Sequence, residues 1–247
     1  MMNLNAWLDN QPLPRPDEIH LLDVREEPLY AQAPSCGPDA LPRRTGLQVE
    51  LTLALRSPDP TRRLSLLEQL LQWCRGRMLP LSCRPGQGLM VRCTLPPALH
   101  STLRWTEEIS LRLAALRPYW TGLHPIRHPF PQPAANHTAT LTIPGTAPCA
   151  PLQLEITPAA PLQSLRVHCG STRMTFQNLS LSPGHTITMG EDDAGRFFLR
   201  RGDASLLHCR TMDSSDSLTL PTCQPTPLSI TGDAPFSGQA LCFPRYM

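Results

Sequence analysis

The sequence predicts a mainly β protein: an α+β N-terminal domain, in which a small antiparallel sheet or split barrel packs against one helix, followed by a C-terminal β-sandwich. Three features of the 247-residue chain predict this fold class. Residues 104–120 and 46–56 alternate apolar and polar side chains, the period of two that half-buried strands show. Residues 60–75 carry a helical period. Residues 138–247 contain about ten short apolar runs between glycine, proline and aspartate turns, which is typical of a sandwich.

The first strands of the N-terminal domain, which we expect to span residues 1–120, are short and follow a proline-rich lead. Residues 19–25 (IHLLDVR) form the first predicted strand. Residues 46–56 (GLQVELTLALR) form the second, with one face buried. The side chains expected on that face are Leu47, Val49, Leu51, Leu53 and Leu55.

A helix is predicted over residues 60–75. Asp59 is a suitable N-cap, and Pro60 fits the first helical position, where its missing amide hydrogen costs nothing. Gly76 ends the run. Apolar residues recur at helical spacing and are expected to face the core: Leu64, Leu67, Leu70, Leu71 and Cys74.

The rest of the domain reads as a hairpin and a last strand. Residues 78–83 and 89–95 predict a hairpin around a turn at 84–88. The strand within RWTEEISLRLAALRPYW follows, and Pro118 ends it because proline cannot donate to a ladder. We predict that Trp105, Pro118, Tyr119 and Trp120 form the structural junction between the two domains. For Tyr119 and Trp120, stacking on a sugar is the alternative.

A proline- and histidine-rich linker is expected at residues 121–137, before the sandwich at 138–247. The strand-like runs are TATLTI (138–143), LQLEI (152–156), QSLRVHC (163–169), RMTFQ (173–177), HTITM (185–189), RFFLR (196–200), SLLHC (205–209), SLTL (217–220), PLSIT (227–231) and QALCF (239–243). No internal repeat points to a solenoid or propeller.

Composition excludes several classes of function. A net charge of +2 argues against a dedicated nucleic-acid binder. All 22 basic residues are arginines, so Walker-type phosphate binding and Schiff-base chemistry are excluded. The first residues lack the basic start and apolar run of a secretory signal, and no apolar stretch reaches the ~18 residues of a membrane span. The nine cysteines show no CxxC spacing, and we interpret them as small core residues rather than disulfides or metal ligands.

Two clusters could bind metal, and for each a structural interpretation is favoured. His124 and His128 have the spacing of zinc ligands on a helix, but a proline follows each of them, so a solvated linker is the better interpretation. Glu191, Asp192 and Asp193 offer carboxylates between two glycines. They lack the alternating pattern of a calcium loop, which favours a hairpin turn.

Other short motifs carry no chemistry. RPGQG (84–88) lacks the lysine of a phosphate loop, and no GxSxG elbow occurs. The Arg-Gly-Asp tripeptide at 201–203 has ordinary turn composition, and the glycosylation patterns at Asn136 and Asn178 carry no information without a secretory signal. We therefore predict no enzyme, no catalytic residue, no cofactor and no metal.

The order of elements resembles that of a known family. The features are the strand and helix ending LLQWCRG, the hairpin MLPLSCRPGQGLMVRCT, the strand RWTEEISLRLAALRPYW, the sandwich with DSSDSLTLP, and a last strand near Phe243, Arg245 and Tyr246. Together they resemble the distal tail protein of tailed bacteriophages, a ring component between the tail tube and the tip or baseplate. One departure is that residues 221–224 (PTCQ) replace the Gly-Asn pair that often opens the penultimate strand.

The resemblance implies a structural protein of the virion tail, assembled in the bacterial host cytoplasm. N-terminal domains would form a homohexameric ring that continues the tail channel, with DNA only as passing cargo and no membrane contact. A galectin-like sandwich would project outward. The implied partners are the tail tube protein, the tail tip or hub protein, and receptor-binding or baseplate proteins. Arginine pairs at 43–44, 62–63 and 200–201 would suit ion pairs between subunits, and the loop Pro34–Arg44 has no assigned role.

The alternative function is a carbohydrate-binding β-sandwich module with an accessory oligomerisation domain. It is suggested by the sandwich alone, and a fold does not by itself give a function. The sequence distinguishes neither a contractile from a non-contractile tail nor the residues that line the channel.

Overall fold

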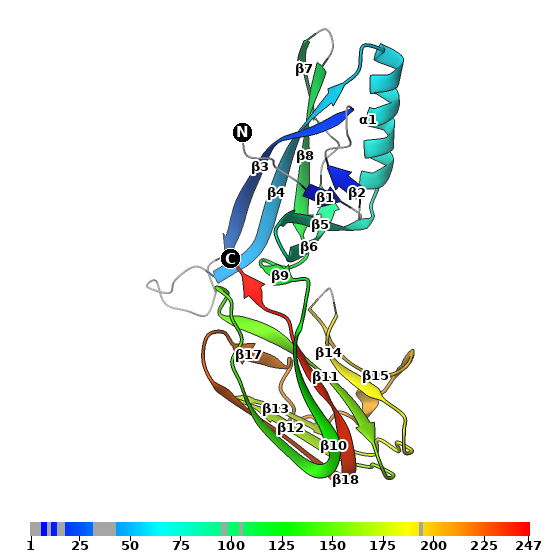
Figure 1. The fold of residues 1–247 in the computed structure, drawn as a ribbon, viewed down its shortest axis with the longest axis vertical. Helices are drawn as coiled ribbons and strands as arrows, with labels where there is room; N and C mark the ends of the chain where they lie inside the picture. Colours follow the sequence, from blue (N-terminus) through cyan, green and yellow to red (C-terminus); the bar gives the residue numbers. More distant parts are fainter. Residues whose placement is uncertain are drawn as a thin grey trace. The chain divides into compact units, whose positions relative to one another are not determined.

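The computed structural model is mainly β and divides into two compact units, Met1–Trp120 (unit 1) and Thr121–Met247 (unit 2) (Figure 1). It describes residues 6–8, 11–13, 18–31, 43–94, 98–103, 106–192 and 195–247. This confirms the predicted fold class. No helix within these ranges is long and apolar enough to cross a membrane.

Unit 1 is one antiparallel sheet with a helix against it (Figure 1). Along the sheet the strands run in the order β2, β1, β5, β6, β8, β4, β3, and β7 pairs with β8. Their bounds are β1 Ala6–Leu8, β2 Gln11–Leu13, β3 Ile19–Ala31, β4 Arg43–Arg56, β5 Met78–Arg84, β6 Gln87–Cys93, β7 Ala98–Leu103 and β8 Thr106–Ala115.

Strands β4 and β8 are neighbours in this sheet and carry much of its core. All five apolar residues predicted on the inner face of β4 are at most 1% exposed, and Ile109, Leu111 and Leu113 of β8 are fully buried. Val49 lies opposite Leu113 and Leu51 opposite Leu111, so the buried side chains pair across the two strands. The period-two prediction is confirmed for both strands.

The helix α1 spans Pro60–Cys74, as predicted. The Asp59 carboxylate accepts a hydrogen bond from the Thr61 amide at 2.9 Å, and Gly76 adopts φ +64° after the last turn. The predicted buried face was partly wrong. Leu64 is 55% exposed, whereas Leu66 is fully buried.

The helix is rotated because its core face includes a charged residue. Arg63 is only 7% exposed, and its guanidinium donates to the Ser57 carbonyl just before the helix. Positions 63, 66, 67 and 70 form the buried stripe at spacings of three and four residues. A search for leucines alone misses this register.

The hairpin of unit 1 is confirmed, and one strand was missed. Strands β5 and β6 pair through a turn in which Gly86 adopts φ +69°. Strand β7 also pairs with β8, although no strand was predicted there. Its six residues lie directly before RWTEEIS in the sequence, without a glycine or proline to separate two strands.

Residues 121–137, predicted as a linker, belong instead to unit 2. After β9 (Trp120–Gly122), strand β10 spans Ile126–Leu141 and pairs along β18. Within the described residues β18 is its only ladder neighbour. A strand at the edge of a sheet tolerates proline, and the register shift between Phe130 and Ala134 absorbs the proline-rich run.

Most of the other elements of unit 2 belong to the sandwich, whereas β19 pairs with β9. They are β11 Cys149–Pro158, β12 Leu165–Cys169, β13 Thr172–Phe176, β14 Ile187–Glu191, β15 Phe197–Arg201, β16 Ala204–Ser205, a 3-10 turn at Leu207–Cys209, β17 Thr219–Pro221, β18 Thr226–Cys242 and β19 Arg245–Tyr246. The strand order is β13, β12, β18, β11, β14, β15, β16. One continuous core lies inside, with Phe176, Phe236 and Ile156 fully buried.

Two predictions on the strands of unit 2 were wrong. Residues 227–231 and 239–243 were expected to form separate strands, but β18 runs through both. Its first half pairs with β12 and its second half with β11, so Gly232 and Gly238 lie within a strand that changes partners. Residues 205–209 form mainly a 3-10 turn, in which the Cys209 amide donates to the Leu206 carbonyl.

Candidate functional site

The predicted junction residues lie among charged groups of unit 1. Trp120 is fully buried, and its Nε1 donates to Oε2 of Glu26 at 3.0 Å. Arg84 donates to both oxygens of the same carboxylate, at 2.9 and 2.6 Å, and its guanidinium carbon lies 5.1 Å from the Trp120 ring centre. The three side chains come from β3, β5 and the end of unit 1, and both oxygens of the Glu26 carboxylate accept hydrogen bonds.

The remaining predicted junction residues are less enclosed. Tyr119 is half-buried, and the Arg44 guanidinium lies 5.6 Å from its ring centre. Pro118 is half-buried after the end of β8. Trp105 lies outside the described residues. A junction role for the four residues stays a prediction. No sequence pattern pointed to Glu26 or Arg84, which are 94 and 36 positions from Trp120.

The acidic turn of unit 2 is a hairpin turn, as predicted. It joins β14 to β15, and Gly195 adopts φ +80° within it. The Asp192 carboxylate accepts hydrogen bonds from the Arg196 amide at 2.9 Å and from Arg196 Nε at 3.0 Å. Glu191 forms an ion pair at 3.0 Å with Arg245. These carboxylates are therefore occupied by arginines, and Asp193 lies outside the described residues.

The histidines and the turn motif do not converge on a site. His124 is exposed, and His128 lies within β10. Across the described ranges, no group of three or more metal-binding side chains comes together. Residues 201–203 form the tight turn between β15 and β16, where Gly202 adopts φ +56°. In the PTCQ segment, Cys223 itself adopts φ +58°, a conformation that glycine would favour.

The cysteines of the described part are free thiols in different environments. Cys169, Cys209 and Cys242 are buried, as predicted, but Cys223 is exposed. Burial raises the pKa of Cys169 and of Cys242 from 9.0 to about 12. Burial, followed by the Glu26 carboxylate, raises the pKa of Cys83 to the same value.

We expect an alkylating reagent at pH 8 to modify Cys223 rapidly and to leave Cys169 and Cys242 unmodified until the chain unfolds, because the thiolate is the reactive species. Peptide mapping by mass spectrometry checks this site by site.

The raised pKa values leave the free energy of unfolding unchanged below about pH 9. It should fall as the pH rises toward 12, since the unfolded chain then loses these protons first. Early labelling of Cys169 by the alkylating reagent, before the chain unfolds, would contradict the prediction that this thiol is protected by burial.

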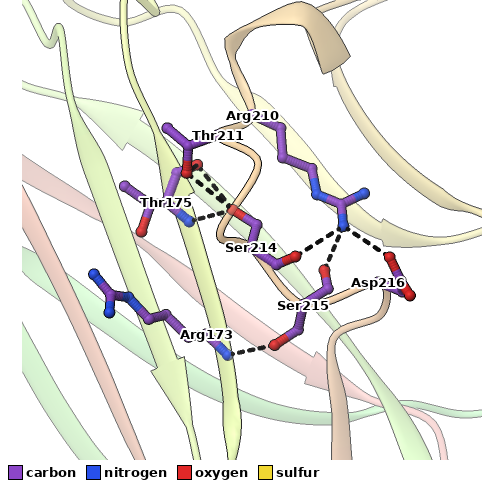
Figure 2. Close-up of polar contacts among 7 residues, drawn as sticks. All are labelled: Arg173, Thr175, Arg210, Thr211, Ser214, Ser215 and Asp216. Atoms are coloured by element: carbon purple, nitrogen blue, oxygen red, sulfur yellow. Dashed lines mark hydrogen bonds and ion pairs between the residues drawn. The ribbon is translucent and has the colours of Figure 1, made fainter.

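A polar loop covers the outer edge of strand β13, which ends one side of the unit 2 sheet (Figure 2). The Ser214 hydroxyl accepts a hydrogen bond from the Thr175 amide, and the Ser215 hydroxyl accepts one from the Arg173 amide, both at 2.9 Å. The Ser215 amide donates to the Arg173 carbonyl at 2.7 Å. The loop therefore takes the place of a neighbouring strand.

Arg210 holds this loop in shape. Its guanidinium donates to the carbonyls of Ser214 and Ser215, at 3.3 and 2.6 Å, and contacts Asp216 at 3.4 Å (Figure 2). It also lies 5.4 Å from the centre of the Phe197 ring. This is the DSSD segment of the sequence, and its side chains close an edge of the sandwich.

The outer face of the unit 1 sheet, opposite to the face that carries Leu47 and Val49, has an ordered pattern of its own. The register places Glu27 of β3 opposite Gln48 of β4, Gln48 opposite Ala114 of β8, and Ala114 opposite Arg92 of β6. Glu27 and Arg92 are exposed at the two ends of this row. An acidic side chain on the edge strand β3 and a basic side chain on β6 thus lie three strands apart on one sheet face.

An apolar row lies two residues further along the same face. Leu29 of β3 lies opposite Gly46, and Met90 of β6 lies opposite Pro80 of β5. The amide of Leu116 donates to the Met90 carbonyl at 3.0 Å. Leu29 and Leu116 are 38% and 45% exposed. The face therefore offers apolar surface beside a charged row.

The fold defined by these two units is that of phage tail hub proteins. The Dit protein (gp 19.1) of phage SPP1, described as a paradigm of the hub adsorption apparatus in phages that infect Gram-positive bacteria, matches with a TM-score of 0.69. The match covers 99% of this chain and 99% of that chain at 12% identity. The predicted resemblance to the distal tail protein family is confirmed in the fold.

Baseplate structures give a second match. The phage P2 baseplate in its activated conformation with Ca contains a chain that matches with a TM-score of 0.50 at 11% identity, over 97% of this chain and 98% of that one. The corresponding structure with Sr matches at 0.51 and 10% identity, over 95% and 97%. No family model and no curated protein matches the sequence.

Proposed function

We propose that this chain is a distal tail protein that forms a hexameric ring between the tail tube and the tip or baseplate of a phage. The observation that carries the proposal is the fold match to the SPP1 hub protein over essentially the full length of both chains. Both units are therefore present in the same order as in that protein. The role is structural, without enzymatic activity.

The two units have separate tasks in this proposal. Unit 1 builds the ring around the channel through which DNA passes, and unit 2 anchors peripheral tip or receptor-binding proteins. The tail tube protein and the tip or hub protein bind the two sides of the ring. Assembly takes place in the host cytoplasm, and the ring is carried in the virion tail.

Cyclic assembly needs two different complementary surfaces on one subunit, because each copy binds its neighbour head to tail. Unit 1 offers opposite charges at the two ends of one sheet row. The predicted arginine pairs are already engaged in part within the chain. Arg62 pairs with Glu18 at 2.7 Å, and Arg63 binds Ser57. They support the monomer fold more directly than a subunit contact.

The mass of the purified chain in solution tests the proposal. Light scattering across a concentration series should give a species of ~164 kDa, six times the 27.4 kDa of one chain. A mass of one chain at every concentration would contradict the ring and would direct the next experiment to glycan binding by unit 2. A dimer would contradict it too, since an isologous contact closes without forming a channel.

A further inference from the structure

Strand β3 lies at one edge of the unit 1 sheet. In unit 2 the Ser214–Ser215 loop satisfies the outer backbone groups of β13, as Figure 2 shows. The prolines of β10 and the two-residue length of β16 limit pairing at its other edges. In contrast, β3 is 13 residues long and, among the described strands, has its main ladder with β4. Leu29 and Tyr30 near its end are exposed.

The edge of β3 does not favour a long backbone ladder with a strand of a partner. Pro28 lacks an amide hydrogen, and the Val24 amide is already bound by the Asp23 side chain at 2.9 Å. A register shift between Leu21 and Asp23 interrupts the strand further back. A partner at this edge is therefore held by side chains, and those exposed toward the end of β3 are Glu27, Leu29 and Tyr30. Further back on β3, Leu22 is exposed, and the exposed Arg25 is already paired with Asp23 at 2.7 Å.

The part of the same sheet face that lies on β6 and β5 has the complementary chemistry. Arg92 is exposed on β6, and Met78, opposite Arg92, follows the exposed residues Arg75 and Arg77. Met90 and Pro80 add half-buried apolar surface beside them. Within the described residues, no ion pair involves Glu27 or any of these three arginines.

Glu27 and Arg92 cannot pair within one chain. Three strand spacings separate them in the row, which is roughly 14 Å at about 4.8 Å for each spacing. Two copies placed side by side bring the acidic end of one row to the basic end of the next. The apolar rows then meet as well, because both rows run in the same direction across the sheet.

We propose that adjacent copies in the ring meet through these two ends, with Glu27, Leu29 and Tyr30 of one copy against Arg92, Met90 and Pro80 of the next. The occupant of each end is a second copy of this chain, selected by opposite charge beside apolar surface. The contact is heterologous, as a closed ring requires. This interface rests on the ring of the proposed function and adds the residues that join its subunits.

A charge exchange tests the interface. Glu27→Arg and Arg92→Glu, made singly, should each weaken ring association on the order of tenfold or more, because like charges then face each other across the contact. The double variant restores opposite charges and should recover most of the wild-type association. Mass photometry gives the fraction of rings at each concentration, and circular dichroism with thermal melting verifies folding.

Glu68→Arg is the matched control, since it makes the same charge change at an exposed position on α1 of the same unit. It should assemble like the wild type. If the wild type forms rings and the folded single variants assemble equally well, or the double variant fails to recover, this interface is wrong while the ring stands. If the folded wild type forms no ring at any concentration, the proposed function itself fails, and this interface with it.

Discussion

Replacing Glu191 with alanine should destabilise unit 2 by about 3–5 kcal/mol, because it leaves the Arg245 guanidinium buried without its counter-charge. The side chains of Arg245 and Glu191 are only 9% and 6% exposed, and their charged atoms are 3.0 Å apart. The carbonyl of Arg245 also accepts hydrogen bonds from the amides of Thr146 and Ala147. The pair thus holds the last strand of the chain against β14.

Thermal unfolding monitored by circular dichroism measures this effect, and the transition of unit 2 should fall by roughly 10 °C. The double variant Glu191→Leu with Arg245→Met removes both charges and should recover most of the loss, since replacing a buried ion pair by apolar side chains is often neutral. Asp192→Ala, in the exposed ion pair next to it, should cost under about 1 kcal/mol. Equal losses for Glu191→Ala and the double variant would contradict the explanation by an unpaired charge.

Substitution of Gly238 by alanine should also have a large effect. Gly238 lies opposite Ile156 of β11 and Phe130 of β10, in the half of β18 that follows its change of partner. A Cβ atom there would overlap the carbonyl oxygen of Glu155 and approach Phe130 Cε2 to 2.9 Å. The clash is with backbone, so it cannot be relieved by a side-chain rotation.

We expect Gly238→Ala to cost about 3 kcal/mol or more, at the upper end of overpacking effects. Chemical denaturation should show a lower midpoint with an unchanged slope, since the variant and the wild type expose a similar surface area when they unfold. Ser237→Ala, one residue earlier in the same strand, controls for a general effect of substitutions in β18. A stability for Gly238→Ala within 0.5 kcal/mol of the wild type, about the size of a neutral surface change, would show that β18 relaxes at this position.

The parts of the fold that follow from local chemistry could be predicted from sequence. In β4 and β8, leucine and valine occupy every second position because one face fills the core. The helix begins at an Asp-Pro pair and ends before a glycine. These patterns need no knowledge of the partner strand, so the sequence alone was sufficient for them.

The predictions that were wrong depend on contacts that no local sequence pattern shows. The prolines of residues 126–137 indicated a linker, but β10 has a neighbour on one side only and tolerates them there. Residues 227–231 and 239–243 were expected to be separate strands, but Gly238 lies within β18, where it provides room for the Glu155 backbone. Leu64 was placed in the core because the buried Arg63 was not recognised as part of the helix face. The errors at β10 and Gly238 reflect neighbours that are distant in sequence.

The contacts of the candidate sites were the least predictable. Glu26 and Arg84 are 58 residues apart in sequence, and no local pattern relates them to each other or to Trp120. The charged row from Glu27 to Arg92 appears only when the registers of three strand pairs are combined. The resemblance to a tail protein indicated a ring, but the residues proposed to join the copies required the structure.

The measurement that tests the central claim most directly is electron microscopy of the purified full-length chain at the concentration where the mass is constant. We predict closed rings with six-fold symmetry and an open centre, built from unit 1, with unit 2 at the periphery. Particles without a central opening, or open filaments in place of closed rings, would contradict the assignment of this chain as a tail hub.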